Sequence, residues 1–330
     1  MTDDVRSSPR VPLGTWPTPL EPVPRLAEAL GLQPEDLWIK RDDLMGIGGG
    51  GNKLRKLEWT CGAAQSEGAT TLITTGAAQS NHARLTAAAG ARLGLDVVLV
   101  LAGTPGSSTS GNLALDGLFG ATIVWAGAAG DQELAIAAEE VAADLRRRGA
   151  VPVVIPFGGS SVTGARGYVE CAKELLEQAP DLGTVVCAVG SGGTMAGLVA
   201  TLGPSRVLGV DCGAIADPAT TIATLVSGLS DEPVSPDSLR LDRNQVGAGY
   251  STLTEPVKSA LALTARTAGI ILDPIYTGRA MAGLIAAAGT GTLSPGHRTI
   301  FLHSGGLPGF FGHPATVAWA QQQSEGSAEG

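Results

Sequence analysis

Short runs of β-branched and aliphatic residues alternate along the chain with longer stretches rich in alanine and leucine. This alternation is typical of strands that form a parallel sheet and of helices that cover it. Eight strands are predicted: Leu37–Arg41, Thr70–Thr74, Asp96–Leu101, Thr122–Trp125, Val151–Ile155, Thr184–Ala188, Arg206–Val210 and Thr299–Leu302. The pattern therefore predicts an α/β fold with mostly parallel sheets.

The N-terminal segment departs from this alternation. Six prolines lie between Pro9 and Pro24. Because proline fixes its own backbone and restrains the residue before it, the segment is predicted to run extended over a surface. A second proline-containing stretch, residues 231–237, is predicted to be an exposed loop.

Composition and charge narrow the class of protein. Of the 330 residues, 44% are hydrophobic and 16% are charged, which favours a compact core over disorder. The net charge is −9 and the longest basic run is Arg146-Arg147-Arg148, so no nucleic-acid partner is expected. No apolar run approaches the ~20 residues that cross a bilayer, and the N-terminal Met1-Thr2-Asp3-Asp4 is polar. We expect a cytoplasmic protein without a membrane partner.

The four cysteines, Cys61, Cys171, Cys187 and Cys212, lie far apart and form no Cys-x-x-Cys pair. This spacing argues against a zinc site and against a disulfide framework. No metal is expected, and a reducing compartment fits best.

Two turns directly after predicted strands are candidate ligand sites, because ligands of open α/β sheets bind beyond the carboxyl ends of the strands. One is Gln79-Ser80-Asn81-His82. The other is Gly190-Ser191-Gly192-Gly193-Thr194, whose backbone N–H groups and hydroxyls at a helix start would cradle a phosphate. It matches neither a P-loop nor a dinucleotide fingerprint. The alternative is a tight turn without a ligand.

A glycine-rich stretch ends on a candidate nucleophile. Gly48 to Gly51 are four consecutive glycines, followed by Asn52 and by Lys53 at the start of an amphipathic helix. The helix dipole, together with Arg55 and Lys56, would lower the pKa of the Lys53 amine and free it as a nucleophile. The alternative is a flexible loop followed by a solvated basic helix start.

A nucleophilic lysine and a phosphate cradle on an α/β scaffold are what pyridoxal phosphate requires. The sequence also resembles the D-cysteine desulfhydrase and 1-aminocyclopropane-1-carboxylate deaminase family, pyridoxal phosphate enzymes of fold type II, the tryptophan synthase β-like class. The resemblance extends from about Leu13 to about Phe311. It rests on four motifs in order: Gly50-Gly51-Asn52-Lys53-Leu54-Arg55-Lys56-Leu57-Glu58, Gln79-Ser80-Asn81-His82, Gly190-Ser191-Gly192-Gly193-Thr194 and Leu272-Asp273-Pro274-Ile275-Tyr276-Thr277-Gly278.

The resemblance implies a role for each motif. Lys53 would form the Schiff base with the cofactor and move the Cα proton of the substrate. Asn81 would hydrogen-bond the 3′-oxygen of the cofactor. Gly190, Ser191, Gly192, Gly193 and Thr194, with Lys56, would hold its phosphate. Ser80 would act on the substrate, which Gln79, Asn81 and His82 would also contact. From the residues alone, Ser80 and Asn81 could equally be a helix N-cap pair.

Two tyrosines and two further positions complete the implied site. Tyr250 and Tyr276 match tyrosines that face the substrate in the family, and Tyr276 could act as a general acid or base if nearby cations lowered its pKa. Thr277 and Ser304 stand at cofactor-contacting positions where the deaminases of the family carry glutamate and leucine. Both replacements resemble the desulfhydrases, since a hydroxyl would leave the pyridine nitrogen closer to neutral, which suits β-elimination.

These residues lead us to expect a pyridoxal phosphate-dependent carbon–sulfur lyase that converts a small β-substituted amino acid, foremost D-cysteine, to pyruvate, sulfide and ammonia. Alternatives on the same fold are an aminocyclopropane-carboxylate deaminase, an L-cysteate sulfo-lyase, an amino-acid racemase, or an enzyme that acts on a modified cysteine. From another class, a non-catalytic pyridoxal phosphate carrier or an amino-acid sensor stays open.

The resemblance also implies the domain organisation. Two three-layer α/β domains are expected, with residues 1–51 and 164–330 forming the larger, cofactor-binding domain and residues 52–163 the smaller, inserted one. Homodimers are common in this class, so a homodimer is expected.

Overall fold

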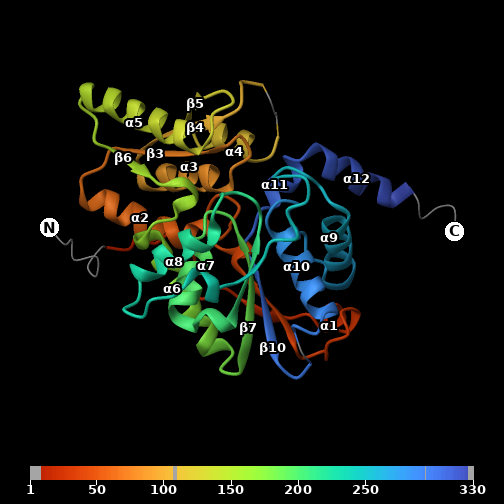
Figure 1. Cartoon of the computed structure of the whole chain (residues 1–330). Coiled ribbons are helices and arrows are strands. Elements are labelled where there is room, and N and C mark those ends of the chain that lie inside the picture. The colour runs from red at the N-terminus through yellow and green to blue at the C-terminus, as the bar shows by residue number, and fades with distance from the viewer. Residues whose placement is uncertain (1–8, 107–109, 294, 326–330) are drawn as a thin grey trace.

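The structure is a computed structural model that describes residues 9–106, 110–293 and 295–325. The polar segment Met1–Asp4 and parts of both expected domains lie outside these residues. The strands form two sheets, one of six strands in the order β1-β2-β10-β7-β8-β9 and one of four in the order β5-β4-β3-β6 (Figure 1). Each sheet lies between layers of helices, so the chain folds into two three-layer α/β units.

The six-stranded sheet is parallel except at one edge. Its strands are β1 (Leu20–Pro22), β2 (Leu37–Arg41), β10 (Arg298–His303), β7 (Leu182–Val189), β8 (Val207–Asp211) and β9 (Arg240–Asp242). Only β1 runs antiparallel to its neighbour. Successive residues of a strand face opposite sides of a sheet. Val186 therefore packs on one face, and its neighbours Val185 and Cys187 pack on the other.

Helices cover both faces of this sheet. The first face holds α1 (Pro24–Ala29), α9 (Glu255–Ala268) and α10 (Thr277–Gly289), and the second holds α6 (Val162–Gln178), α7 (Gly193–Leu202) and α8 (Pro218–Ser227). Near the C-terminus, α11 (Leu307–Phe311) and α12 (Pro314–Glu325) lie close to α9 (Figure 1). A sheet that is buried on both faces requires strands that are almost continuously apolar, and β7 and β8 have this composition.

The four-stranded sheet is parallel throughout. It contains β5 (Thr122–Trp125), β4 (Asp96–Ala102), β3 (Thr71–Ala77) and β6 (Pro152–Ile155). Its first face packs on α2 (Lys53–Ser66) and α3 (Asn81–Leu93), with α4 (Asn112–Leu118) beside α3. Its second face packs on α5 (Asp131–Arg147).

A buried ionic cluster fixes α2 against the larger sheet. Arg55 on α2 pairs with Asp42, which directly follows β2, at 2.8 Å, and with Glu174 on α6 at 2.8 Å. The Tyr168 hydroxyl donates to the same Asp42 at 2.6 Å. Gly167 allows the close approach, since a Cβ there would lie 2.1 Å from the Arg55 carbonyl oxygen. The first residue of α2, Lys53, is therefore held in a defined place between the two sheets.

The predicted fold class is confirmed, and all eight predicted strands are present, with ends that differ by up to three residues. The strands β1 and β9 were missed because each has only three residues, too few to show an alternation. The boundaries of the two expected domains stay a prediction, which the division of β3–β6 from the other strands supports.

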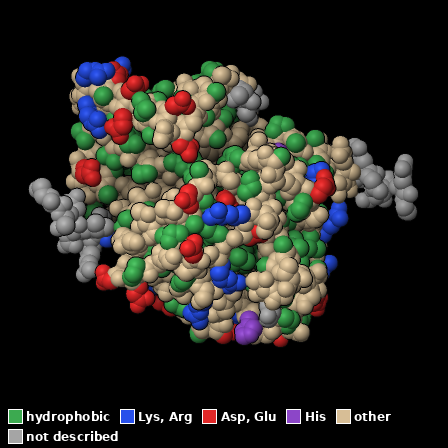
Figure 2. All heavy atoms as spheres, viewed as in Figure 1, with side chains coloured by type: hydrophobic (Ala, Val, Ile, Leu, Met, Phe, Trp, Pro, Cys, Tyr) green, Lys and Arg blue, Asp and Glu red, His purple; other side chains and the backbone are tan. Residues whose placement is uncertain are grey.

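The surface and the helices bear on possible partners. On the face that Figure 2 shows, lysine and arginine side chains are dispersed and interspersed with acidic ones. Among the described residues, no helix is long and apolar enough to cross a membrane. All four cysteines are free and buried. Burial raises the pKa of the Cys61 and Cys187 thiols to about 12, and it raises those of Cys171 and Cys212 as well.

Candidate active site

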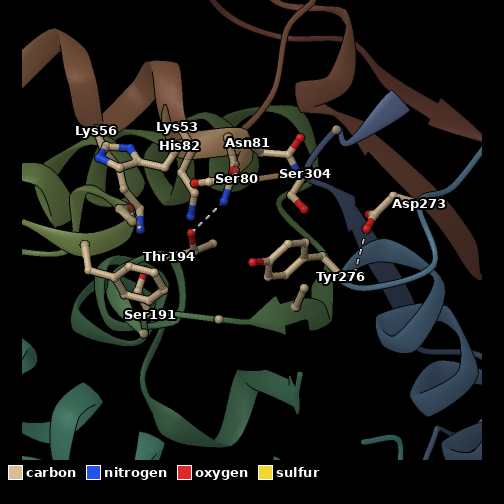
Figure 3. Close-up of a pocket in the computed structure, with 17 residues that line it drawn as sticks. Lys53, Lys56, Ser80, Asn81, His82, Ser191, Thr194, Asp273, Tyr276 and Ser304 are labelled. Carbon is tan, nitrogen blue, oxygen red and sulfur yellow. Dashed lines mark hydrogen bonds between the residues drawn. The ribbon is translucent and has the colours of Figure 1, made fainter. Parts of the chain in front are cut away.

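A pocket between the two sheets brings most of the candidate residues together (Figure 3). Helix starts and strand ends supply its walls: the start of α2, the start of α3, the turn between β7 and α7, and the segments before α10 and after β10. Its lining residues are Asn52, Lys53, Lys56, Ser80, Asn81, His82, Phe157, Gly158, Ala188, Gly190, Ser191, Gly192, Thr194, Asp273, Tyr276, Ser304 and Gly305.

Two lysines lie on one side of this pocket, Lys56 buried and Lys53 half-buried. Burial is the main cause that lowers the pKa of Lys53, to about 8. Burial, with Lys53 close by, lowers the pKa of Lys56 far below its usual value. The Lys56 amine donates to the Gly158 carbonyl oxygen at 3.2 Å and to Ser160 Oγ at 3.0 Å. The expected low pKa of Lys53 is thus present, but desolvation causes it, since Arg55 turns away into its ion pairs.

The turn after β7 forms an anion cradle next to Lys56. The Gly193 N–H donates to Ser160 Oγ at 3.1 Å, and Ser160 Oγ lies 2.7 Å from Ser191 Oγ. A Cβ at Gly193 would lie 3.0 Å from the Lys56 amine, so glycine permits the close approach. Gly193 itself does not line the pocket. Ser160 was missed from the sequence, although hydroxyl residues directly after Gly158-Gly159 were a usable signal.

The start of α3 places three residues in the pocket. Ser80 is the N-cap of α3, where its Oγ accepts from the Ala83 N–H at 3.1 Å, so the N-cap interpretation also holds for it. His82 is buried, and neither ring nitrogen has a hydrogen-bond partner among the described residues. Burial and the charges of Lys53 and Lys56 hold its pKa well below the usual value, which leaves the ring neutral.

Gln79 faces away from the pocket. Its Oε1 accepts from the Asn112 N–H at 2.8 Å, and its Nε2 donates to the Ser110 carbonyl oxygen at 3.0 Å. The contact with substrate expected from the resemblance is therefore not supported by its position. Gln79 ties the loop before α3 to the start of α4.

The two tyrosines form a hydrogen-bonded pair through their hydroxyls, with the rings edge to face at 6.0 Å. Tyr276 lines the pocket, and both line an adjoining cavity of about 260 Å³ that also contains Ser80 and Phe157. Burial raises the pKa of Tyr250 to about 12 and also raises the pKa of Tyr276 well above its usual value. The lowered tyrosine pKa considered from the sequence is thus wrong, and both hydroxyls stay protonated.

Thr277 lies behind the pocket wall. Its hydroxyl donates to Asp273 Oδ1 at 2.7 Å and accepts from the Asp273 N–H at 2.8 Å. Asp273, which does line the pocket, also accepts from the N–H groups of residues 275, 276 and 277. Asp273 was missed although it lies within the fourth motif. Ser304 lines the pocket as expected, and its carbonyl oxygen accepts from the Asn52 N–H at 2.9 Å.

A buried lysine beside a phosphate-sized cradle, held between two three-layer α/β units, defines a pyridoxal phosphate-dependent enzyme. Residues 11–305 match the family model described as pyridoxal-phosphate dependent enzyme, and the chain belongs to that family. A protein of Pyrococcus abyssi named "Putative 1-aminocyclopropane-1-carboxylate deaminase" is 40% identical over 92% of this chain and 93% of its own length.

Two solved structures resemble the chain in fold. The crystal structure of an ACC deaminase homologue superposes with a TM-score of 0.84 at 35% identity, covering 96% of this chain and 99% of that one. Threonine deaminase isoform 2 from Solanum lycopersicum superposes with a TM-score of 0.65 at 20% identity, over 92% of this chain and 82% of that one, which indicates the shared fold. The resemblance to the deaminase and desulfhydrase family is confirmed, and the cofactor is pyridoxal phosphate.

The pocket residues fit this cofactor. Neither Lys53 nor Lys56 forms an ion pair with a carboxylate in the described part of the chain, although both amines are desolvated enough to lower their pKa values. Two neighbouring desolvated amines without an anion are unfavourable, and a phosphate at the start of α7 would supply the missing negative charge. Lys53 would hold the aldehyde carbon, and Lys56 with the Gly190–Thr194 turn would hold the phosphate. No cluster of metal-binding side chains occurs within the described ranges.

Proposed function

We propose that the protein is a carbon–sulfur lyase that eliminates the β-substituent of a small amino acid, foremost D-cysteine. The observation that carries this proposal is the environment of position 277, where the deaminases of the family carry glutamate. Here the position holds Thr277, whose hydroxyl is engaged by Asp273. The resemblance implies that a glutamate at this position keeps the pyridine nitrogen protonated. Elimination needs less electron withdrawal than cyclopropane ring opening, because the departing thiolate carries the electrons away.

The residues of the pocket divide the chemistry among them. When bound, the cofactor withdraws electron density from Cα and makes its C–H bond acidic. The Lys53 amine, whose pKa of about 8 leaves part of it unprotonated near neutral pH, takes the Cα proton. The Cβ–S bond breaks, and sulfur leaves with the electron pair as hydrosulfide. The protonated Tyr276 hydroxyl, on the wall shared with the adjoining cavity, donates a hydrogen bond to the departing sulfur.

The overall reaction balances without an oxidant or reductant. The aminoacrylate product takes up one water and breaks down, so that D-cysteine and water give pyruvate, ammonia and hydrogen sulfide. Ser80 Oγ and Asn81 stand where the substrate carboxylate would enter, at the positive end of α3.

The test is product formation by the holoenzyme. Pyruvate is measured with D-cysteine, L-cysteine, β-chloro-D-alanine and cysteate, and sulfide is measured with the two cysteines. A Lys53→Ala variant and a Lys173→Ala control on the exposed side of α6 are assayed beside the wild type. We expect pyruvate from D-cysteine with the wild type and the control, and none with Lys53→Ala. Absence of pyruvate from all four compounds would overturn the proposal.

A second candidate is supported by the relatives themselves. The Pyrococcus abyssi protein carries the name "Putative 1-aminocyclopropane-1-carboxylate deaminase", and the superposed structure is described as an ACC deaminase homologue. Ring opening with one water would give 2-oxobutyrate and ammonia. Formation of 2-oxobutyrate from aminocyclopropane-carboxylate, without sulfide from D-cysteine, would select this candidate.

Two expectations from the sequence belong with the proposed function. The homodimer is tested by light scattering of the holoenzyme, where a single chain mass of 33.2 kDa would contradict it. The cytoplasmic location likewise stays a prediction, which cell fractionation would test.

A further inference from the structure

A buried arginine behind the pocket connects three segments of the site. Arg84 on α3 is fully buried and forms no ion pair among the described residues. Its Nη1 donates to the carbonyl oxygens of Gly48 and Gly50, the latter at 2.9 Å, and these glycines belong to the loop before Lys53. Its Nε donates to Asn112 Oδ1 on α4 at 3.0 Å. The fourth bond, from Nη2, goes to Asn81 Oδ1 at 3.4 Å.

The hydrogen-bonding chemistry of Arg84 fixes the orientation of the Asn112 side chain, which in turn fixes that of Asn81. A guanidinium can only donate hydrogen bonds. The atom of Asn112 that faces Arg84 must therefore be its oxygen, which turns Asn112 Nδ2 to the other side. There Nδ2 donates to the Gln79 carbonyl oxygen at 2.9 Å and to Asn81 Oδ1 at 3.1 Å. Because two donors converge on Asn81 Oδ1, the side-chain amide cannot turn over without placing N–H against N–H.

Because Oδ1 is engaged by Arg84 and Asn112, the amide nitrogen of Asn81 is the side-chain atom that remains for a ligand. It forms no hydrogen bond within the described part of the protein, while Asn81 lines the pocket. An N–H donor at this place suits an anionic oxygen. A carbonyl oxygen there would repel one.

We propose that Arg84 and Asn112 are positioning residues that act through Asn81, holding its amide N–H toward the anionic 3′-oxygen of the cofactor. This inference rests on the proposed role of Asn81 in cofactor binding. It does not require D-cysteine as the substrate.

Arg84 keeps its charge in this setting. Burial lowers its pKa to about 10, and the charge of Asp116 on α4 opposes that effect, so the guanidinium stays protonated near neutral pH. Neither oxygen of Asp116 has a hydrogen-bond partner among the described residues, so Asp116 does not compete for the donors of Arg84.

The test is the pH titration of the visible absorption band of the holoenzyme. The nitrogen that would link Lys53 to the cofactor carries the proton that titrates. Negative charge on the nearby 3′-oxygen stabilises that proton, and an N–H donor to the 3′-oxygen weakens this stabilisation. Loss of the donor therefore raises the pH midpoint of the band, and a change of about one pH unit is expected for a hydrogen bond to a charged group. Asn81→Ala removes the donor itself, so its pH midpoint sets the shift with which the other variants are compared.

Asn112→Leu removes the side-chain amide that connects Arg84 to Asn81, and it adds no charge. We expect it to raise the midpoint in the same direction as Asn81→Ala, and to add nothing in the Asn81→Ala background, since the two substitutions remove one interaction. Arg84→Lys, which keeps the charge but loses the planar fork, is the second variant should Asn112→Leu not fold. Arg92→Gln on the exposed end of α3 is the matched control and should leave the midpoint unchanged.

A shift by Asn112→Leu that persists in the Asn81→Ala background would overturn the inference, since Asn112 would then act by another route. An unshifted midpoint in either single variant would overturn it as well. Pyruvate release from D-cysteine is measured on the same wild-type preparation. If pyruvate is absent while the midpoints shift as expected, the proposed function fails and the positioning role stands.

Discussion

The buried Asp116 predicts how the free energy of unfolding changes with pH, including the direction of the change. Its carboxylate is buried on α4 without a hydrogen-bond partner in the described part of the chain, and burial raises its pKa from 3.8 to about 7. In the unfolded chain the group ionises near 3.8, so the folded protein binds more protons between these two values. The free energy of unfolding therefore falls as the pH rises through this range, and the loss is complete above pH 7.

The magnitude follows from the two pKa values. At about 1.4 kcal/mol for each pH unit, the charged Asp116 costs the folded state about 4 kcal/mol above pH 7. Asp116→Asn, which is uncharged at every pH, should lose this dependence. When the pH is raised from 5.5 to 8, the free energy of unfolding of the variant should rise by about 2 kcal/mol relative to that of the wild type.

Urea unfolding of the holoenzyme at each pH measures this difference. The wild type and the variant are compared at the same cofactor concentration, so that effects of the cofactor cancel. Asp237→Asn, at an exposed position in the short 3-10 helix Pro236–Ser238, is the control, and its free energy of unfolding should differ from that of the wild type by the same amount at each pH. A constant difference for Asp116→Asn as well would refute the reasoning, because it would mean that Asp116 titrates as it does in water.

Three further predictions follow from contacts described above or from single buried groups. Lys56→Met should weaken cofactor binding by about 10- to 100-fold in a fluorescence titration of the apoprotein, since the phosphate would lose a charge-assisted hydrogen bond; an unchanged Kd would place the phosphate elsewhere. Glu58→Gln should lower the free energy of unfolding by about 2–4 kcal/mol, because this buried carboxylate accepts four hydrogen bonds from the N-terminal segment. Glu170→Gln, at a partly exposed carboxylate on α6, is the control and should leave the free energy of unfolding nearly unchanged. Gly197→Ala should lower the melting temperature, since its Cβ would lie 2.3 Å from a carbonyl oxygen of α6, while Gly117→Ala, with open space around it, should not.

The strands could be predicted because their signal is local. Each of the eight is a run of β-branched and aliphatic residues that ends in a turn, and the buried parallel strands show this most clearly. Lys53 and the Gly190–Thr194 turn could likewise be recognised as candidate site residues, because each combines a telling residue type with the start of a helix. The strands β1 and β9 gave no such signal, since edge pairing of three residues depends on the neighbouring strand.

The orientation of side chains was not predictable in the same way. Gln79 lies within a recognised motif but faces α4, because the start of that helix supplies its partners from a distant part of the sequence. The pKa of Tyr276 rises because the hydroxyl is enclosed, and enclosure depends on packing that no local pattern records. Thr277, the first residue of α10, pairs with Asp273 in the turn before that helix, which sequence spacing permits but does not require.

The four cysteines have a practical consequence for any study of this protein. A thiol buried with its pKa raised to about 12, as in Cys61 and Cys187, is almost wholly protonated at neutral pH and is sealed from reagents. A colorimetric thiol reagent added to the folded protein should therefore respond to sulfide or cysteine in solution and not to the protein itself. Once the chain opens, four equivalents become reactive together, so the same reagent counts unfolded molecules without a label.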